Sequence, residues 1–94
     1  MKFITTFSWA PDAEKRAEAF ARFQRTGGLP PEGVKLLGRW TRVDLNGGFD
    51  LVETDDMKKL AQFAYEWNDL MQLTTTPVMD DAELGEVLSC VSKA

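Results

Sequence analysis

The chain has 94 residues, which suits one domain with one modest core spanning residues 1–94. Six Phe, three Trp and one Tyr supply enough aromatic surface to argue against disorder. Eleven basic residues oppose 15 acidic ones, the net charge is -4, and the basic residues are scattered, so we expect no nucleic-acid partner. No apolar run suits a signal peptide or a membrane span, and one cysteine allows no disulfide framework. These features predict a cytoplasmic protein with no membrane partner.

The first half of the chain alternates between patterns typical of strands and helices. Residues 2–9 alternate apolar and hydroxyl side chains, which predicts a strand. Residues 11–27 place alanines and Phe20 at helical spacing, which predicts an amphipathic helix. Residues 34–44 and 49–54 are rich in strand formers, and Asn46-Gly47-Gly48 between them suits a hairpin turn.

The second half repeats the alternation. A second helix is predicted over residues 57–68, with Thr54 or Asp55 as its cap. Residues 70–79 predict a fourth strand, in which Pro77 indicates an edge position. Asp80 and Asp81 then suit the start of a short C-terminal helix, whose apolar side would be Leu84, Val87, Leu88 and Val91.

The order β-α-β-β-α-β is typical of a ferredoxin-like α+β fold. Right-handed crossovers predict a four-stranded antiparallel sheet in the order 4-1-3-2, with two helices on one face and, in addition, a short C-terminal helix. The helix-free face would then expose Ile4, Leu37 and Val52. We therefore expect a homodimer in which two such faces meet.

The predicted hairpin sets which side chains share a face. A two-residue loop at Asn46-Gly47 or a four-residue loop over residues 45–48 would place Trp40 opposite Glu53, and Arg39 would point through the other face of the sheet. A three-residue loop would not give this register. Glu53 beside an aromatic wall is then the best candidate for an acid or base. A structural alternative pairs Glu53 with Arg42 across the ladder.

Further residues suggest a ligand site without fixing its chemistry. Arg39 could bind a carboxylate or carbonyl group, although Asp50 on the same face could neutralise it instead. Trp9, Trp40 and Trp67 could line a cleft between the sheet and its helices, or simply fill the core. We favour the helix side for the site, with Trp40 and Glu53 in it.

The chain has no histidine, which excludes imidazole catalysis and the commonest nitrogen ligand of metals. Cys90 lies on the short C-terminal helix with little basic surrounding, so an activated thiolate is not expected. We accordingly expect no metal and no cofactor.

Four segments together resemble the domain-of-unknown-function family 3303 (DUF3303): GGLPPEGVKLLGRW, FDLVETDD, YEWNDL and TPVMDD. The resemblance covers nearly the whole chain. It implies membership of the dimeric α+β barrel superfamily, which includes cofactor-free oxygenases and isomerases as well as proteins without known activity.

Three functions remain open from the sequence. The first is a homodimer that binds a small organic molecule without transforming it. The second is a cofactor-independent oxygenase or isomerase in which Trp40, Glu53 and Arg39 orient and deprotonate an acidic phenol or enol. The third is a purely structural dimer.

Overall fold

The computed structural model describes residues 1–9 and 11–91 of the chain. Its elements are β1 (Lys2–Ser8), α1 (Ala13–Thr26), β2 (Lys35–Thr41), β3 (Gly47–Glu53), α2 (Met57–Tyr65), β4 (Gln72–Val78) and α3 (Asp81–Cys90). The predicted β-α-β-β-α-β order followed by a short helix is confirmed.

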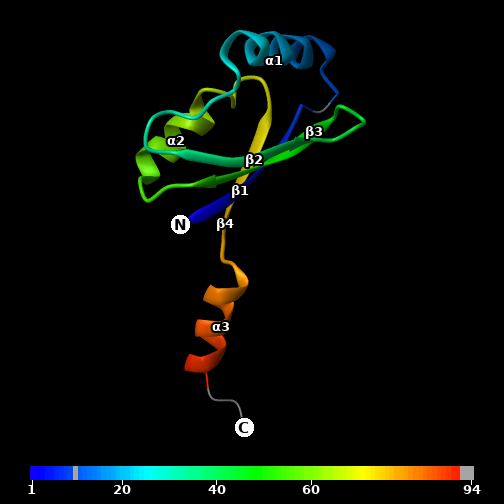
Figure 1. Cartoon of the computed structure of the whole chain (residues 1–94). Helices are drawn as coiled ribbons and strands as arrows, with labels where there is room; N and C mark the ends of the chain where they lie inside the picture. The colour runs from blue at the N-terminus through cyan, green and yellow to red at the C-terminus, as the bar shows by residue number, and fades with distance from the viewer. Residues whose placement is uncertain (10, 92–94) are drawn as a thin grey trace.

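The strands form one antiparallel sheet in the order β2-β3-β1-β4 (Figure 1). This is the predicted ferredoxin-like topology, with β1 between β3 and β4. Pro77 lies in the edge strand β4, opposite Phe3. Proline has no N–H to donate, and at an edge position this removes no hydrogen bond between central strands.

Local signals in the sequence explain where the helices begin and end. Asp12 precedes α1 and accepts a hydrogen bond from the Lys15 backbone N–H at 3.0 Å. Gly27 ends α1 with φ 73°, a left-handed conformation that glycine adopts without a steric penalty. The cap of α2 is Asp56, one or two residues beyond the predicted Asp55 or Thr54.

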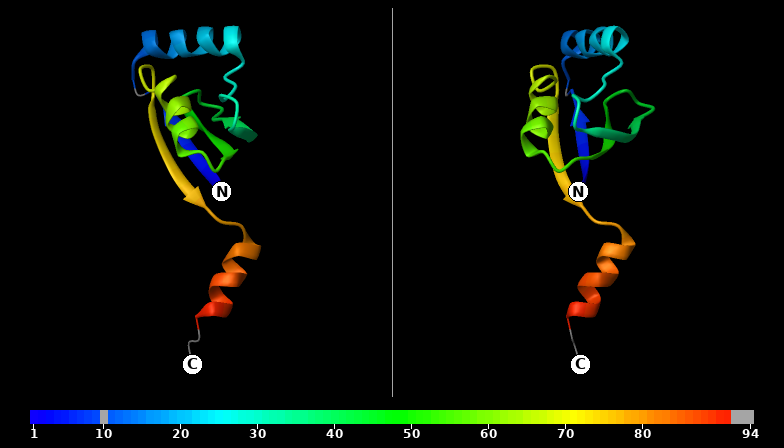
Figure 2. Two further views of the ribbon diagram at one scale, coloured as in Figure 1. Left: turned by 90° about the vertical axis from the view of Figure 1, so that its left-hand side faces the viewer. Right: turned by 60° about the vertical axis from the view of Figure 1, so that its left-hand side comes forward.

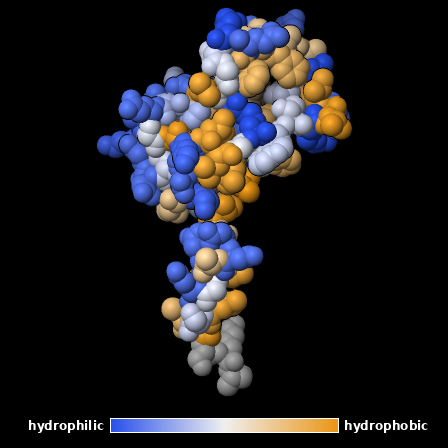
Figure 3. Space-filling model, in the orientation of Figure 1, coloured by the Kyte–Doolittle hydropathy of each residue, from blue (hydrophilic) through white to orange (hydrophobic). Residues whose placement is uncertain are grey.

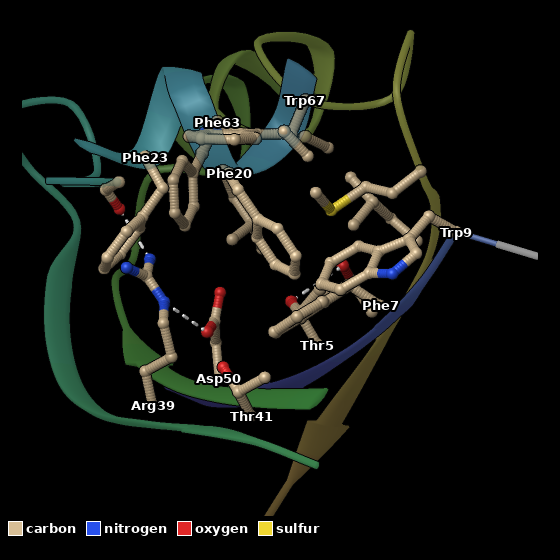
Figure 4. A pocket seen from close by; sticks show the side chains of 17 residues that line it. Thr5, Phe7, Trp9, Phe20, Phe23, Arg39, Thr41, Asp50, Phe63 and Trp67 are labelled. Carbon is tan, nitrogen blue, oxygen red and sulfur yellow. Dashed lines mark hydrogen bonds and ion pairs between the residues drawn. The ribbon is translucent and has the colours of Figure 1, made fainter. Parts of the chain in front are cut away.

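Helices α1 and α2 lie over one face of the sheet, which we call the covered face (Figures 2 and 4). The core forms here, where Phe3, Val52 and Phe63 pack together with Val34. Val52 is fully buried, so its predicted exposure on the opposite, open face is wrong. Ile4 does lie on the open face, because it alternates with the buried Phe3 and Thr5.

The β2–β3 hairpin differs from the prediction in its register. The Arg42 N–H donates to the Gly47 carbonyl at 2.8 Å, so residues 43–46 form the loop rather than Asn46-Gly47. Trp40 consequently pairs with Phe49, and Glu53 pairs with Lys35. A bulge between Leu36 and Gly38 also moves Leu36 to the covered face, opposite Val52, and leaves Leu37 half-exposed.

Helix α3 projects away from the rest of the molecule (Figures 1 and 2). It covers neither face of the sheet, and none of its ten residues is buried. A capping box between Asp80 and Glu83 fixes its first turn. Among the described residues, no helix is long and apolar enough to cross a membrane.

Candidate binding cavity

A cavity of about 210 Å³ lies between the covered face and helices α1 and α2 (Figure 4). The sheet forms its floor, and the two helices form its roof. Its lining comprises Thr5, Phe7, Trp9, Ala19, Phe20, Phe23, Gly28, Arg39, Thr41, Asp50, Leu60, Phe63, Ala64, Trp67, Met71, Leu73 and Thr75. Most of these side chains are apolar, and aromatic rings come from both the sheet side and the helix side.

The aromatic rings support one another around the cavity. Trp9 meets the edge of Phe20 at a centroid distance of 5.2 Å, and Phe7 lies 5.8 Å from Trp9. The indole N–H of Trp9 donates to the Leu45 carbonyl at 2.7 Å, which fixes the ring orientation. Trp67 lies under the guanidinium of Arg22 at 5.5 Å from the ring centroid.

An ion pair occupies the floor of the cavity. The Arg39 Nε donates to Asp50 Oδ1 at 2.8 Å, and both side chains are largely buried. Arg39 also donates to the carbonyl oxygens of Gly27 at 3.3 Å and Gly28 at 2.5 Å. The C-terminal end of α1 is thereby joined to the edge strand β2 and, through Asp50, to its neighbour β3.

Asp50 is only 6% exposed, and one of its carboxylate oxygens points into the cavity towards Phe20 (Figure 4). Burial raises the pKa of this carboxyl above its usual value, while the hydrogen bond and charge of Arg39 act in the opposite direction. A carboxyl group whose pKa is raised in this way is better suited to accept a proton than an exposed aspartate.

The family model described as "Domain of unknown function (DUF3303)" matches residues 1–92. The chain belongs to this family. None of the curated proteins matches it. The predicted family is therefore confirmed, whereas the dimeric α+β barrel superfamily stays a prediction.

The structure brings three of the predicted site residues of this DUF3303 chain into the cavity: Trp9, Arg39 and Trp67. The predicted position of Arg39 on the face opposite the helices is wrong, because Arg39 pairs with Asp50 on the covered face. Trp40 is on the open face with 60% of its surface exposed, and it is not part of the lining. Glu53 lies at the end of β3, with Lys2 and Lys35 as its cross-strand neighbours. The predicted pairing of Trp40 with Glu53 is thus wrong, because the hairpin loop lies earlier in the chain than expected. The alternative pairing of Arg42 with Glu53 is wrong as well, since Arg42 contacts Asp44.

Sequence reasoning missed two threonines that add hydroxyl groups to the floor of the cavity. Thr5 and Thr75 come from neighbouring strands, and their hydroxyl oxygens lie 3.1 Å apart. Thr5 is buried between Phe3 and Phe7 in β1, where a third apolar residue would be ordinary. A polar residue at an inward position of a strand is the signal that could have found this site.

The acidic residues of this chain do not gather into a metal site. Within residues 1–9 and 11–91, no three His, Cys, Asp or Glu side chains come together in a way that could hold a metal ion. The DUF3303 chain thus presents an aromatic cavity with a small number of polar groups, an arrangement that is typical of sites for organic molecules.

Proposed function

We propose that this DUF3303 domain binds a compact organic molecule in the cavity between the covered face and helices α1 and α2. The observation that carries the proposal is the size of this space inside so small a domain. A cavity of about 210 Å³ is large for a chain of 94 residues, and its lining is mostly apolar with a few polar groups. That combination is typical of a site for a small organic molecule.

The proposal can be tested by filling the cavity. Ala19 is buried in α1 and lines the cavity, whereas Ala17 is exposed on the same helix. Ala19→Leu should abolish binding of a panel of one-ring and two-ring aromatic compounds, measured by saturation-transfer NMR, while leaving the protein as stable or more stable. Ala17→Leu is the matched control and should bind like the wild type. Equal binding by both variants would contradict the proposal, and no binding to the wild type would favour a purely structural dimer.

A second candidate function is a cofactor-independent oxygenase or isomerase. Asp50 favours it, because a buried carboxylate with a raised pKa faces the aromatic space where a phenol or enol would lie. Asp50 would take the acidic proton, and an oxygenase would use dioxygen as the second substrate. Turnover of an enolisable or phenolic panel that disappears in Asp50→Asn would support catalysis. Binding without turnover would limit the function to ligand binding.

We also propose that the domain works as a homodimer. Two apolar surfaces of one chain support this proposal: the open face with Ile4, Trp40 and Phe49, and the exposed apolar side of α3. Figure 3 shows hydrophobic surface over the strands and again along the projecting helix. Isolated helices shorter than about 12 residues are marginal in water, so α3 is expected to need a surface outside its own chain.

In a dimer with a two-fold axis, the open face and α3 of each chain would contact the same surfaces of the other chain. Such a contact is reciprocal and closed. Light scattering at micromolar concentration should give a mass of two chains. If α3 contributes to the contact, a chain without residues 81–94 should give a mass nearer to that of one shortened chain than of two. A single-chain mass for the intact protein would contradict the homodimer. The cytoplasmic location stays a prediction.

A further inference from the structure

A row of polar side chains crosses the floor of the cavity. Arg39 pairs with Asp50 between β2 and β3, Asp50 with Thr5 between β3 and β1, and Thr5 with Thr75 between β1 and β4. Each strand of the sheet thus contributes one polar residue at the same level. Because the rings above them are apolar, these four residues and the neighbouring Thr41 are the polar side chains that a ligand meets in the cavity.

Arg39 at one end of the row is already engaged by its own chain. Its guanidinium has five N–H groups, and its three nitrogens donate to Asp50, Gly27 and Gly28. The ring of Phe23 lies against it, with the centroid 5.7 Å from the guanidinium carbon. The charge of Arg39 is balanced by Asp50 and its fork is fixed, so it is a poor receptor for a free anion.

The groups that remain available are mainly acceptors. Arg39 is the only hydrogen-bond partner of the Asp50 carboxylate within residues 1–9 and 11–91, and the other oxygen faces the cavity. Next to it lie the hydroxyls of Thr5 and Thr75, which can accept as well as donate. The N–H of Trp9 is not available, because it is bound to Leu45. A cationic ligand would approach the guanidinium of Arg39 too closely, which leaves a neutral donor as the best match.

We propose that the cavity selects neutral aromatic compounds that carry a hydroxyl or N–H donor, and that this donor binds Asp50. The inference rests on the proposed function of the same cavity and adds the chemical class of the ligand. An apolar cavity of about 150 Å³ holds benzene, so 210 Å³ admits one substituted ring or two fused rings. A phenol suits this space, since it stays protonated and neutral at pH 7.

Three probes of one shape separate the possible ligand classes. 2-Naphthol donates a hydrogen bond, 2-methoxynaphthalene only accepts one, and 2-naphthoate is an anion. Titration calorimetry at pH 7 should show 2-naphthol binding about tenfold tighter than 2-methoxynaphthalene, the effect of one hydrogen bond to a charged group. 2-Naphthoate should bind more weakly still. Tighter binding of 2-naphthoate, or equal binding of all three, would overturn the ligand class while leaving the binding function in place. No binding of any probe would overturn both.

Asp50→Asn tests the role of the carboxylate directly. The amide oxygen should take the N–H of Arg39, which turns the NH₂ donor towards the cavity. The preference should therefore reverse in favour of 2-methoxynaphthalene, whereas Asp69→Asn on the surface should keep the wild-type order. Thr5→Val provides a second variant of nearly equal shape and should reduce the preference for 2-naphthol a fewfold. An unchanged preference in both cavity variants would contradict the inference.

Discussion

Each face of the sheet departs from what an ordinary sheet with one buried side carries. The covered face holds apolar core residues such as Phe3 and Val52, but it also carries Arg39, Asp50 and Thr5 beneath two helices. The open face carries Trp40 and Phe49, both exposed. A sheet in a lone soluble domain usually places apolar side chains inwards and polar ones outwards.

These two departures support the proposals of a ligand at the covered face and of a second copy at the open face. Buried polar groups are costly unless they have partners, and part of the Asp50 carboxylate still faces the cavity. Exposed aromatic side chains on a sheet are usually covered by association. The covered face is therefore the proposed place of a ligand, and the open face is the proposed contact with a second copy of the chain.

The largest expected effect concerns the ion pair of the covered face. Arg39→Met keeps an apolar stem but leaves Asp50 buried without its counter-charge and removes two bonds to carbonyl oxygens. The free energy of unfolding should fall by about 2–3 kcal/mol in urea titrations at fixed protein concentration. Adding Asp50→Asn to this variant should restore part of the loss.

A matched change on an exposed pair provides the control for that experiment. Arg42 contacts Asp44 next to the hairpin loop, and both side chains are largely accessible to water. Arg42→Met should leave the urea midpoint nearly unchanged, since exposed pairs contribute little. A similar loss for both variants would mean that the buried pair has no special role.

Substitutions on the open face should change the dimer dissociation constant rather than the folding stability of one chain. Trp40→Ala removes an exposed aromatic side chain from both copies of the proposed symmetric contact, at about 1 kcal/mol for each copy and thus about 2 kcal/mol for the dimer. Sedimentation velocity should show a dimer dissociation constant raised about 30-fold. Tyr65→Ala, at an exposed aromatic residue of α2, should not change it. Equal behaviour of the two variants would place the contact elsewhere.

A substitution at Gly28 tests whether the contact between the end of α1 and Arg39 stabilises the covered face. Its φ is 61°, and an added Cβ would lie 2.6 Å from Arg39 Nη1. Gly28→Ala should therefore lower the unfolding free energy by about 1–2 kcal/mol and weaken ligand binding. An added Cβ at Gly85 in α3 would meet no atom within 4 Å, so Gly85→Ala should raise the helical signal in circular dichroism instead.

The smallest expected effect is a pH dependence of opposite sign at two aspartates. Burial raises the pKa of Asp50, so its stabilising contribution is present below its ordinary pKa of about 3.9 and is lost as pH rises through the higher folded value. The hydrogen bond from Arg22 lowers the pKa of Asp69, so its contribution is present above pH 4 and is lost at lower pH. We compare the unfolding free energy of each variant with that of the wild type at the same pH. As the pH rises from about 3 to 7, this difference should shift in favour of Asp50→Asn and against Asp69→Asn. Parallel curves for the two variants would contradict these assignments.

The sequence was sufficient to predict the elements and the sheet order, because alternation, caps and the edge-marking Pro77 are local signals. The register of the β2–β3 hairpin was not predictable in the same way. Asn46-Gly47 looked like a two-residue turn, but the loop covers residues 43–46, and Leu45 adopts a φ of 60° that favours glycine or asparagine. The bulge after Leu36 likewise depends on packing against distant residues.

The composition of the site was predicted only in part. Arg39, Trp9 and Trp67 reach the cavity, and the alternative pairing of Arg39 with Asp50 is confirmed. The assignment of Trp40 to the helix side and of Arg39 to the opposite side failed, since long-range contacts of Val52 with Phe63 decide which face the helices cover. Alternation along a strand separates two sets of side chains, but it does not say which set is buried.

The indole N–H signals of the three tryptophans offer the most direct test of the contrast between the two faces. Trp9 and Trp67 line the cavity, and Trp40 lies on the open face. In ¹H–¹⁵N spectra, addition of 2-naphthol should shift the signals of Trp9 and Trp67 and leave Trp40 unchanged. Dilution through the dimer dissociation range should shift Trp40 and leave the other two unchanged. A ligand response at Trp40 alone, or a dilution response centred on Trp9 and Trp67, would contradict the assignment of ligand and partner to separate faces.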